Sequence, residues 1–328
     1  MNFKFLHLVI SVFLVFPVSS EEIFFNNHNI HGEDSTFKDF IKWQLSGNKP
    51  DRFSIEMSDE FNLLLKKPKT PYAVWVGHSN FLINNNDINI LTDPIFSKRA
   101  SPISFAGPKR LIPPGINFNL LPDIDVVTVS HAHYDHMDIP TLKRLYEINK
   151  NTLFLVPMNS AKLLLSAGIK NVVEMNWWDT ISLSDTLITF VPVHHWSSRT
   201  PFDKNETLWG GWWFEHSSLK LVHLGDTGYT YDFLTINKEL GSPDFAFIPI
   251  GAYEPRSIMK DSHLNPDEAI QTALDLNATH AIGMHWGTFM LTDEPVQEPP
   301  VLVKNRLKEL DLEGLFTIPI PGKIISLE

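Results

Sequence analysis

The segment from His131 to His136 limits what this chain can fold into more than any other. It places three histidines and one aspartate within six residues, directly after the apolar run 126–129. Three imidazoles and a carboxylate are costly to bury unless a bound cation satisfies their lone pairs. Zinc, which accepts nitrogen and oxygen ligands, is such a cation. The segment therefore predicts a metal-binding loop after a strand, with a solvated histidine-rich turn as the weaker alternative.

Composition narrows the classes of protein to consider. The chain has 328 residues, 43% of them hydrophobic, which is enough for a large core. It has no cysteine, so every metal ligand must be His, Asp or Glu, a set that suits a catalytic site better than a closed structural one. The formal net charge is −11, whereas nucleic-acid-binding proteins are typically basic, so we expect no nucleic-acid partner.

The first twenty residues are typical of a secretory signal peptide. Lys4 precedes the apolar run 5–18, and small residues follow it at 18–20. This run is shorter than the roughly 20 residues that a membrane span needs, although an uncleaved anchor is an alternative. We expect an exported protein, periplasmic or secreted, with residues 1–20 as signal peptide, 21–69 as an N-terminal lead-in and 70–328 as one domain.

Hydrophobic periodicity predicts an α/β fold with two sheets at its centre and helices outside. The predicted strands are 72–76, 81–83, 88–91, 126–129, 153–156, 187–193, 219–224, 245–250, 280–284 and 323–327. The predicted helices are 139–148, 161–167, 266–276 and 300–310. Pro266 followed by two acids is a typical helix start.

Four of these strands end at a side chain that can bind metal. The side chains that follow them are His131, His194 with His195, Asp226 and His285. Strand ends held by a sheet can bring together side chains from distant sequence positions. His195 or His285 alone would more often be a structural histidine. Together with the loop at 131–136, they indicate one shared site.

The short loop cannot give all its side chains to one ion without crowding. We divide them into two pairs, His131 with His133 and Asp135 with His136. Each pair would bind a separate ion.

Each ion then needs a further imidazole, which His195 and His285 can supply. Asp226 is suited to bridge the two ions. Water between two cations loses a proton near neutral pH, so this site predicts a hydroxide nucleophile and hydrolysis.

Longer blocks resemble a known family. They are LTDPIFS at 91–97, RASP at 99–102, GPKR at 107–110, SHAHYDH at 130–136, HW at 195–196, LWG at 208–210, GDTGY at 225–229, IPIGAYEPR at 248–256, HWGTF at 285–289 and EPP at 298–300. In this order they resemble the N-acylphosphatidylethanolamine-hydrolysing phospholipases D of the metallo-β-lactamase superfamily. The likeness extends over about residues 70–300.

The resemblance implies a metallo-β-lactamase-type four-layered αβ/βα sandwich with two Zn²⁺ ions per chain. It assigns His131, His133 and His195 to one zinc ion and Asp135, His136 and His285 to the other, with Asp226 as the bridge. It also implies Asp93 and His263 as catalytic residues together with Asp226.

Other readings of three of these positions stay open. Asp93 precedes Pro94 and could be a turn residue, and His263 could be a surface histidine before a helix. In the active site, His263 would position or protonate the leaving oxygen. A glutamine typical of the family is replaced by His194, which leaves some doubt between it and His195. Neighbouring strand residues face opposite sides, so only one of them can reach the ions.

The implied reaction is hydrolysis of N-acylphosphatidylethanolamine to N-acylethanolamine and phosphatidic acid by a metal-bridging hydroxide. The implied partners are a phospholipid substrate at a membrane surface, with peripheral membrane association, and a second copy in a homodimer. Alternatives are another dizinc hydrolase, such as a lactonase, a nuclease or other phosphodiesterase, and a non-catalytic exported metal- or lipid-binding protein. The acidic charge and the export signal disfavour a nuclease, and the full ligand set disfavours loss of catalysis.

Remaining motifs are interpreted as structural. We predict that His78 supports the ligands rather than binding metal. The tryptophan pairs at 177–178 and 212–213 are predicted to lie in the core. The apolar stretch 111–121 is either a buried loop or one that meets lipid.

Overall fold

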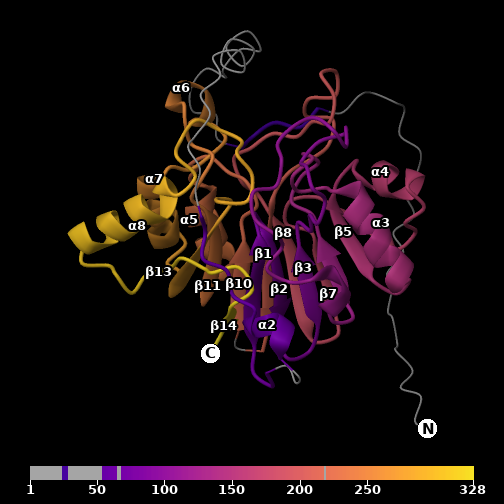
Figure 1. Ribbon diagram of the computed structural model, residues 1–328, viewed down its shortest axis with the longest axis horizontal. Coiled ribbons are helices and arrows are strands. Elements are labelled where there is room, and N and C mark those ends of the chain that lie inside the picture. Colours follow the sequence, from indigo (N-terminus) through magenta and orange to yellow (C-terminus); the bar gives the residue numbers. More distant parts are fainter. Residues whose placement is uncertain (1–23, 29–53, 65–67, 218) are drawn as a thin grey trace.

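Two seven-stranded β-sheets lie face to face in the computed structural model, which describes residues 24–28, 54–64, 68–217 and 219–328 (Figure 1). The first sheet has the order β14-β1-β2-β3-β4-β5-β6 and contains β1 (Tyr72–Gly77), β2 (Asn80–Asn84), β3 (Asn89–Thr92), β4 (Val126–Thr128), β5 (Leu153–Pro157), β6 (Val172–Met175) and β14 (Ile324–Ser326). The second has the order β13-β12-β11-β10-β9-β8-β7 and contains β7 (Thr180–Leu183), β8 (Thr186–Val191), β9 (Gly211–His216), β10 (Leu219–His223), β11 (Phe245–Pro249), β12 (His280–Met284) and β13 (Phe316–Thr317).

The two sheets repeat one pattern of strand pairing. Each has three antiparallel pairings followed by three parallel ones. β4 lies among the parallel strands of the first sheet, and β10 and β12 among those of the second. The carboxyl ends of parallel strands meet at one edge of a sheet, which is where α/β proteins place their sites.

Helices cover the outer face of each sheet and complete four layers. They are α2 (Glu60–Leu63), the 3-10 turn η1 (Phe118–Leu120), α3 (Ile139–Ile148), α4 (Ala161–Ser166), α5 (Asp232–Leu240), α6 (Arg256–Met259), α7 (Pro266–Asp275) and α8 (Glu298–Glu309). α3 and α4 lie on one side and α5, α7 and α8 on the other (Figure 1). The four-layered αβ/βα sandwich is confirmed.

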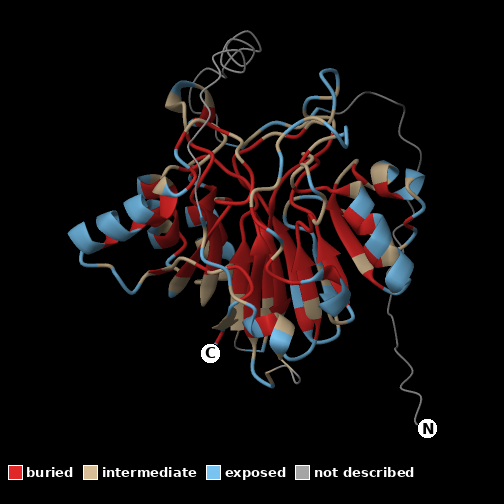
Figure 2. Ribbon diagram, in the orientation of Figure 1, coloured by how far each residue is buried: buried red, intermediate tan, exposed pale blue. Residues whose placement is uncertain are grey.

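Three apolar clusters fill the spaces between these layers. Phe233 and Ile270 belong to the cluster between the second sheet and its helices, and Leu142 to the one between the first sheet and α3. The third lies between the sheets and includes Trp75 and Trp212. Figure 2 shows buried residues along most of both sheets and exposed ones on the outer helices. The strands therefore read as nearly continuous apolar runs.

α7 illustrates how local sequence sets an element. The Asn265 side chain accepts a hydrogen bond from the Glu268 backbone N–H at 2.8 Å, and the Glu268 carboxylate accepts one from the Asn265 N–H at 3.0 Å. Pro266 occupies the first turn, where its missing N–H costs nothing. The predicted start of this helix is confirmed.

The ten predicted strands and four predicted helices are present, with ends within two residues. The prediction omitted β6, β7, β9, β13, α2, α5 and α6. β9 is buried over its first four residues and so shows no alternation of apolar and polar side chains. Its Trp212 and Trp213 lie in the core as predicted.

One interpretation of the tryptophan pairs needs correction. Trp178 is 36% exposed, because it lies in the turn between β6 and β7, with φ at 73°. The stretch 111–121, for which a buried loop and a lipid-facing loop were both open, is buried in part: Ile116 is fully buried, and the Gly115 N–H donates to the Val76 carbonyl at 2.9 Å. Leu120, in η1, is half-exposed.

The expected signal peptide, residues 1–20, lies outside the described residues, as does much of the lead-in. The described parts of the lead-in contact the domain: Phe61 of α2 is buried against the first sheet, and Asn27 contacts the backbone of His195. Among the described residues, no helix is both long enough and apolar enough to cross a bilayer.

Candidate metal centre

Chain segments that follow β4, β8, β10 and β12 converge at one end of the sandwich. β4 leads into the loop 131–136, and β12 is followed directly by His285. The structure brings all seven predicted ligand side chains into overlapping groups of close ligand atoms. These side chains are His131, His133, Asp135, His136, His195, Asp226 and His285.

The first group consists of three imidazoles. His131 Nε2 lies 2.8 Å from His133 Nδ1, and His195 Nε2 lies 3.4 Å from the same atom. Residues outside the group orient two of the rings: Ser130 Oγ lies 2.9 Å from His131 Nδ1, and the Ser262 carbonyl lies 2.9 Å from His195 Nδ1. The nitrogens of the three rings that face one another lie close enough to be ligands of one ion.

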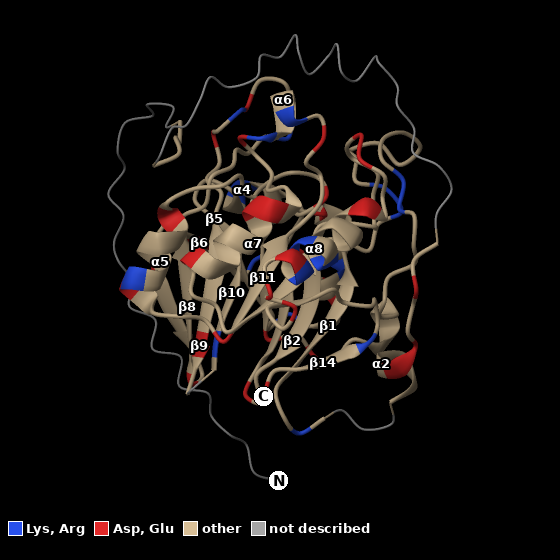
Figure 3. Cartoon of the chain, turned by 90° about the vertical axis from the view of Figure 1, so that its left-hand side faces the viewer, with Lys and Arg blue, Asp and Glu red and all other residues tan. Residues whose placement is uncertain are grey.

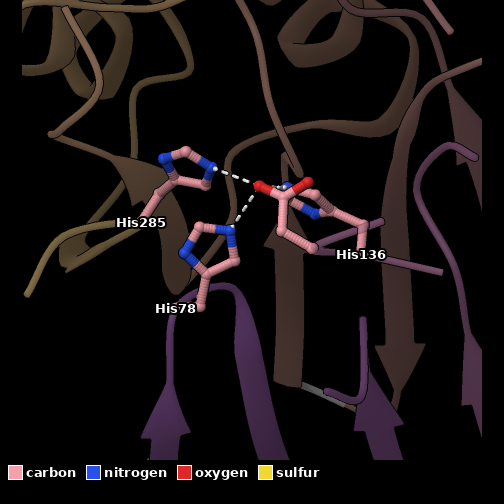
Figure 4. Close-up of side chains that lie close together, drawn as sticks. His78, His136 and His285 are labelled. Carbon is pink, nitrogen blue, oxygen red and sulfur yellow. Dashed lines mark hydrogen bonds and ion pairs between the residues drawn. The ribbon is translucent and has the colours of Figure 1, made fainter. Parts of the chain in front are cut away.

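The second group surrounds the Asp135 carboxylate. His136 Nε2 lies 3.5 Å and His285 Nε2 3.7 Å from Asp135 Oδ2. His78 Nε2 is closer to this oxygen, at 2.9 Å. Figure 4 shows the three labelled imidazoles converging on one carboxylate oxygen.

Asp226 lies between the two groups. Its Oδ2 is 3.2 Å from His136 Nε2 and about equally far, at 3.9 to 4.0 Å, from the imidazoles of His131 and His195. Its Oδ1 is 3.0 Å from His285 Nε2. One carboxylate therefore reaches both groups, which is the placement of a bridging ligand.

Burial leaves the first group uncharged. It lowers the pKa of His133 to about 4 and the pKa values of His131 and His195 well below their usual range, and neighbouring imidazoles add to the effect for the latter two. Neutral imidazoles present lone pairs, which is the form that binds metal.

The second group is balanced by its carboxylates. Burial acts to lower the pKa of His285 and His136, but Asp226 and Asp135 outweigh it, raising that of His285 to about 9 and that of His136 well above its usual range. Burial likewise acts to raise the pKa of both carboxyls, but nearby imidazoles hold them well below their usual range.

Several ligand atoms are buried without a hydrogen-bond partner and could be satisfied by a bound cation. His136 Nε2, His285 Nε2 and Asp226 Oδ1 are buried and make no hydrogen bond. Buried polar atoms rarely lack a partner, because desolvation costs about 1–3 kcal/mol for each. A divalent cation with nitrogen and oxygen ligands would satisfy all three atoms, and the donor set has the hard-to-intermediate character that zinc accepts.

Asp93 lies behind the ligands rather than among them. Its buried carboxylate accepts hydrogen bonds from the Ser130 N–H at 2.6 Å and the Ser130 hydroxyl at 2.7 Å. It also lies 2.8 Å from His136 Nδ1. A carboxylate on the far nitrogen of a ligand histidine fixes the ring and its tautomer. These contacts support a positioning role for Asp93.

His263 lies at the open side of the cluster. Its Nδ1 is 3.9 Å from Asp226 Oδ2, and its side chain keeps 14% of its surface exposed. Arg256 donates to the His263 carbonyl at 2.9 Å and to both Glu268 carboxylate oxygens at 2.8 Å. The segment that carries His263 is therefore clamped onto α7.

Between the adjacent histidines, His195 is the one that joins the ligand groups. The His194 backbone instead bridges to Gly228. His78 Nε2 donates a hydrogen bond to the Asp135 carboxylate, and its ring centre lies 4.0 Å from that of His285. It therefore supports the second group and also lies close enough to be a ligand.

Three site residues adopt a left-handed backbone that side chains disfavour. They are His78, Asp93 and His285, with φ at 59°, 37° and 61°. Such strained positions cluster at functional sites, where the surrounding structure enforces them.

Several supporting groups around the ligands could not be predicted from the sequence. Asn27 accepts from the His195 N–H at 3.1 Å, and the Arg199 guanidinium donates to the carbonyls of Ala132 and Met137, holding the loop 131–136 at both ends. Ser130 was quoted only within a motif. No local pattern marks Asn27 or Arg199 for these roles.

A small cavity of about 20 Å³ adjoins His285. It is lined by Trp286, Phe289 and Leu291 and also by Glu294. The Glu294 carboxylate accepts hydrogen bonds from backbone N–H groups, among them that of Ala252 at 2.7 Å. The cavity has room for about one water molecule next to the ligands.

Comparison with known proteins bears on the same residues. The β-lactamase superfamily domain matches residues 88–286. The chain is 39% identical to N-acyl-phosphatidylethanolamine-hydrolyzing phospholipase D 1 of Caenorhabditis elegans over 73% of this chain and 69% of that protein. It is 36% identical to the mitochondrial N-acyl-phosphatidylethanolamine-hydrolyzing phospholipase D of Saccharomyces cerevisiae over 75% of this chain and 53% of that one.

A solved structure shares the fold. A metallo hydrolase from the archaeon Ignicoccus hospitalis aligns with a TM-score of 0.59 and 19% identity, covering 79% of this chain and 98% of that one.

Proposed function

Because this chain belongs to the β-lactamase superfamily of metal-dependent hydrolases, and within it to the family of N-acylphosphatidylethanolamine-hydrolysing phospholipases D, we propose that it is a zinc-dependent phosphodiesterase of the phospholipase D type. It hydrolyses N-acylphosphatidylethanolamine: water adds to phosphorus, the bond from phosphorus to the ethanolamine oxygen breaks, and N-acylethanolamine and phosphatidic acid leave.

The observation that carries this proposal is the position of Asp226 between two groups of ligands. Its two oxygens approach histidines of both groups within 4.0 Å. Two zinc ions held there would activate water as a nucleophile and neutralise negative charge on the phosphoryl group. A chain with a single ligand group would need no such carboxylate.

The remaining residues position this chemistry. Asp93 and Ser130 fix the rings of His136 and His131 from behind, so these rings need not reorganise during the reaction. His263 lies on the open side, 3.9 Å from Asp226, where its imidazole can position the leaving oxygen.

The names of the similar proteins support a lipid substrate. The relatives from Caenorhabditis elegans and Saccharomyces cerevisiae are both named as phospholipases D that hydrolyse N-acylphosphatidylethanolamine. A phospholipid bilayer is the expected source of this substrate.

The test is hydrolysis of N-acylphosphatidylethanolamine in mixed micelles with mass analysis of the products. We expect N-acylethanolamine and phosphatidic acid in equal amounts, and their loss when a chelator removes the metal. Release of neither product, with ring-opening of lactones by the same preparation, would refute the substrate.

Asp226→Asn tests the bridging position within the same assay. We expect at least about a thousandfold loss of turnover, because metal-ion catalysis supplies several kcal/mol of the lowered barrier. His216→Ala is the control, since His216 ends β9 outside the ligand groups. Full activity of Asp226→Asn would show that the Asp226 carboxylate is not needed for catalysis.

A further inference from the structure

Two loops with exposed aromatic tips rise from the end of the molecule that holds the metal centre. The 97–110 loop carries Phe105, which is 81% exposed, and the 196–206 loop carries Phe202, which is 90% exposed. These are the two most exposed large hydrophobic side chains among the described residues. The 196–206 loop rises at the upper right of Figure 1, and Figure 2 shows exposed residues at its tip.

The 97–110 loop is anchored next to the second ligand group. The Leu111 N–H donates to the Thr288 carbonyl at 2.8 Å, and the Arg110 guanidinium lies 5.0 Å from the centre of the Phe289 ring. That ring meets His78 edge-on at 5.3 Å. The loop therefore projects from the rim of the site.

The 196–206 loop is anchored on the first ligand group. Trp196 lies against His133, with ring centres 4.3 Å apart. Arg199 stacks on Tyr134 and accepts a hydrogen bond from its hydroxyl at the backbone carbonyl.

The tip of this second loop is internally braced. The Asp203 carboxylate accepts hydrogen bonds from the Ser198 hydroxyl and the backbone N–H groups of Arg199 and Thr200, all at 2.8 to 3.0 Å. Phe202 lies within this hydrogen-bonded turn, so the backbone that carries its side chain is held in place.

Charge distinguishes the 97–110 loop from the rest of the surface. The chain has a net charge of −11, yet no acidic residue occurs between Asp93 and Asp123. Four basic residues lie within this interval, in the 97–110 loop: Lys98, Arg99, Lys109 and Arg110. By contrast, acidic side chains are spread over α5 and α7 on the face turned to the viewer in Figure 3.

We infer that Phe105 and Phe202 insert into the interface of a bilayer that contains anionic phospholipid, with the exposed Lys98 and Lys109 of the 97–110 loop contacting its head groups. Aromatic rings partition into the interfacial region, and each Lys or Arg near an anionic surface adds to the attraction. This docking turns the metal centre toward the bilayer. The inference rests on the proposed function for its lipid occupant, but it concerns binding and not turnover.

The absence of cysteine allows a direct test. The full-length variants Phe105→Cys and Phe202→Cys each carry a single thiol for an environment-sensitive fluorophore. Leu63→Cys is the matched control, because Leu63 is 77% exposed but lies in α2 at the opposite end of the molecule (Figure 1). With phosphatidylcholine vesicles containing 30% phosphatidylglycerol, we expect a blue shift in the fluorescence emission of the label at positions 105 and 202 and none at position 63. An equal shift at all three sites, or no shift at 105 and 202, overturns the inference.

Co-sedimentation with the same vesicles measures the contribution of each side chain. Phe105→Ser and Phe202→Ser should each weaken partition about tenfold, since each buries one aromatic ring less. Lys98→Glu with Lys109→Glu should weaken it about tenfold or more on anionic vesicles and have little effect on pure phosphatidylcholine. The variant that combines Phe105→Ser and Phe202→Ser should bind vesicles still more weakly. If it binds anionic vesicles as well as the unchanged protein does, the inference is overturned.

Two activity assays separate this inference from the proposed function. If the loops dock to lipid, the double serine variant keeps its rate on a soluble phosphodiester and loses it on vesicles. If the protein shows no phospholipase activity at all, the labelled variants still decide whether the loops bind a bilayer. Equal loss on soluble and vesicular substrate contradicts docking.

Discussion

The two halves of the molecule have the same strand pairing but supply the metal centre in different ways. The first sheet delivers four ligands from one loop of six residues after β4. The second sheet delivers one ligand at a time, after β8, β10 and β12. The first half therefore concentrates its ligands in sequence, whereas the second depends on the sheet to bring its ligands together.

This difference determines how each half is supported. The loop 131–136 is short and is braced from behind by Asp93 and Ser130 and at its ends by Arg199. The ligands of the second half are held by strands, and the segment near His263 by the contact of Arg256 with Glu268. We expect damage to either half to impair the whole site, since Asp226 connects them.

Removal of one ligand from either half tests whether both halves are needed, and it should have the largest effect. His131→Ala and His285→Ala should each lower phosphodiester hydrolysis by about a thousandfold, because metal ions supply several kcal/mol of the catalysis. Turnover of each purified variant measures this, with His216→Ala as the control. If only the first-half variant loses activity, the two halves do not form one binuclear site.

Gly225 tests the contact between the halves. A Cβ there would lie 2.5 Å from Ser130 Cβ, and φ is 64°. Gly225→Ala should therefore destabilise folding by about 2–4 kcal/mol, from overpacking and backbone strain together. Gly168→Ala is the matched control: φ is 88°, but nothing lies within 4 Å of the added carbon. That variant should cost about 1 kcal/mol.

Urea unfolding of both alanine variants gives the comparison. Equal destabilisation would mean that backbone strain alone acts at Gly225 and that its approach to Ser130 is not tight.

Asp93→Asn tests the brace behind the first half. The loss of its charge should weaken metal binding or activity about 10–100-fold, as is typical of partners of ligand histidines. Competition with a chromogenic chelator measures the affinity directly, separately from folding. An affinity equal to that of the unchanged protein would show that Asp93 does not orient His136.

Arg256→Gln tests the clamp of the second half and should have the smallest effect. We expect about a tenfold loss of turnover with metal content retained, because a charged hydrogen bond to the His263 carbonyl is worth about 1.5–3 kcal/mol and water replaces it in part. Arg306→Gln is the matched control, since Arg306 pairs with the side chains of Asp267 and Glu309 rather than with the His263 carbonyl. Equal losses in both variants would exclude a specific role for Arg256.

The sequence predicted the parts of the site that local pattern encodes. The apolar strands and the loop 131–136 could be identified directly, and the ends of four strands pointed to His195, Asp226 and His285. The roles of Asn27 and Ser262 could not be predicted, because they contact His195 across 168 and 67 residues of sequence. β9 was overlooked because a strand buried on both faces shows no alternation.

We propose that the two halves of the molecule hold two metal ions together through Asp226. The metal content of active protein tests this proposal most directly. Elemental analysis of purified chain should give two divalent ions per active molecule and about one in His285→Ala. Full activity with a single ion per chain would contradict a binuclear centre.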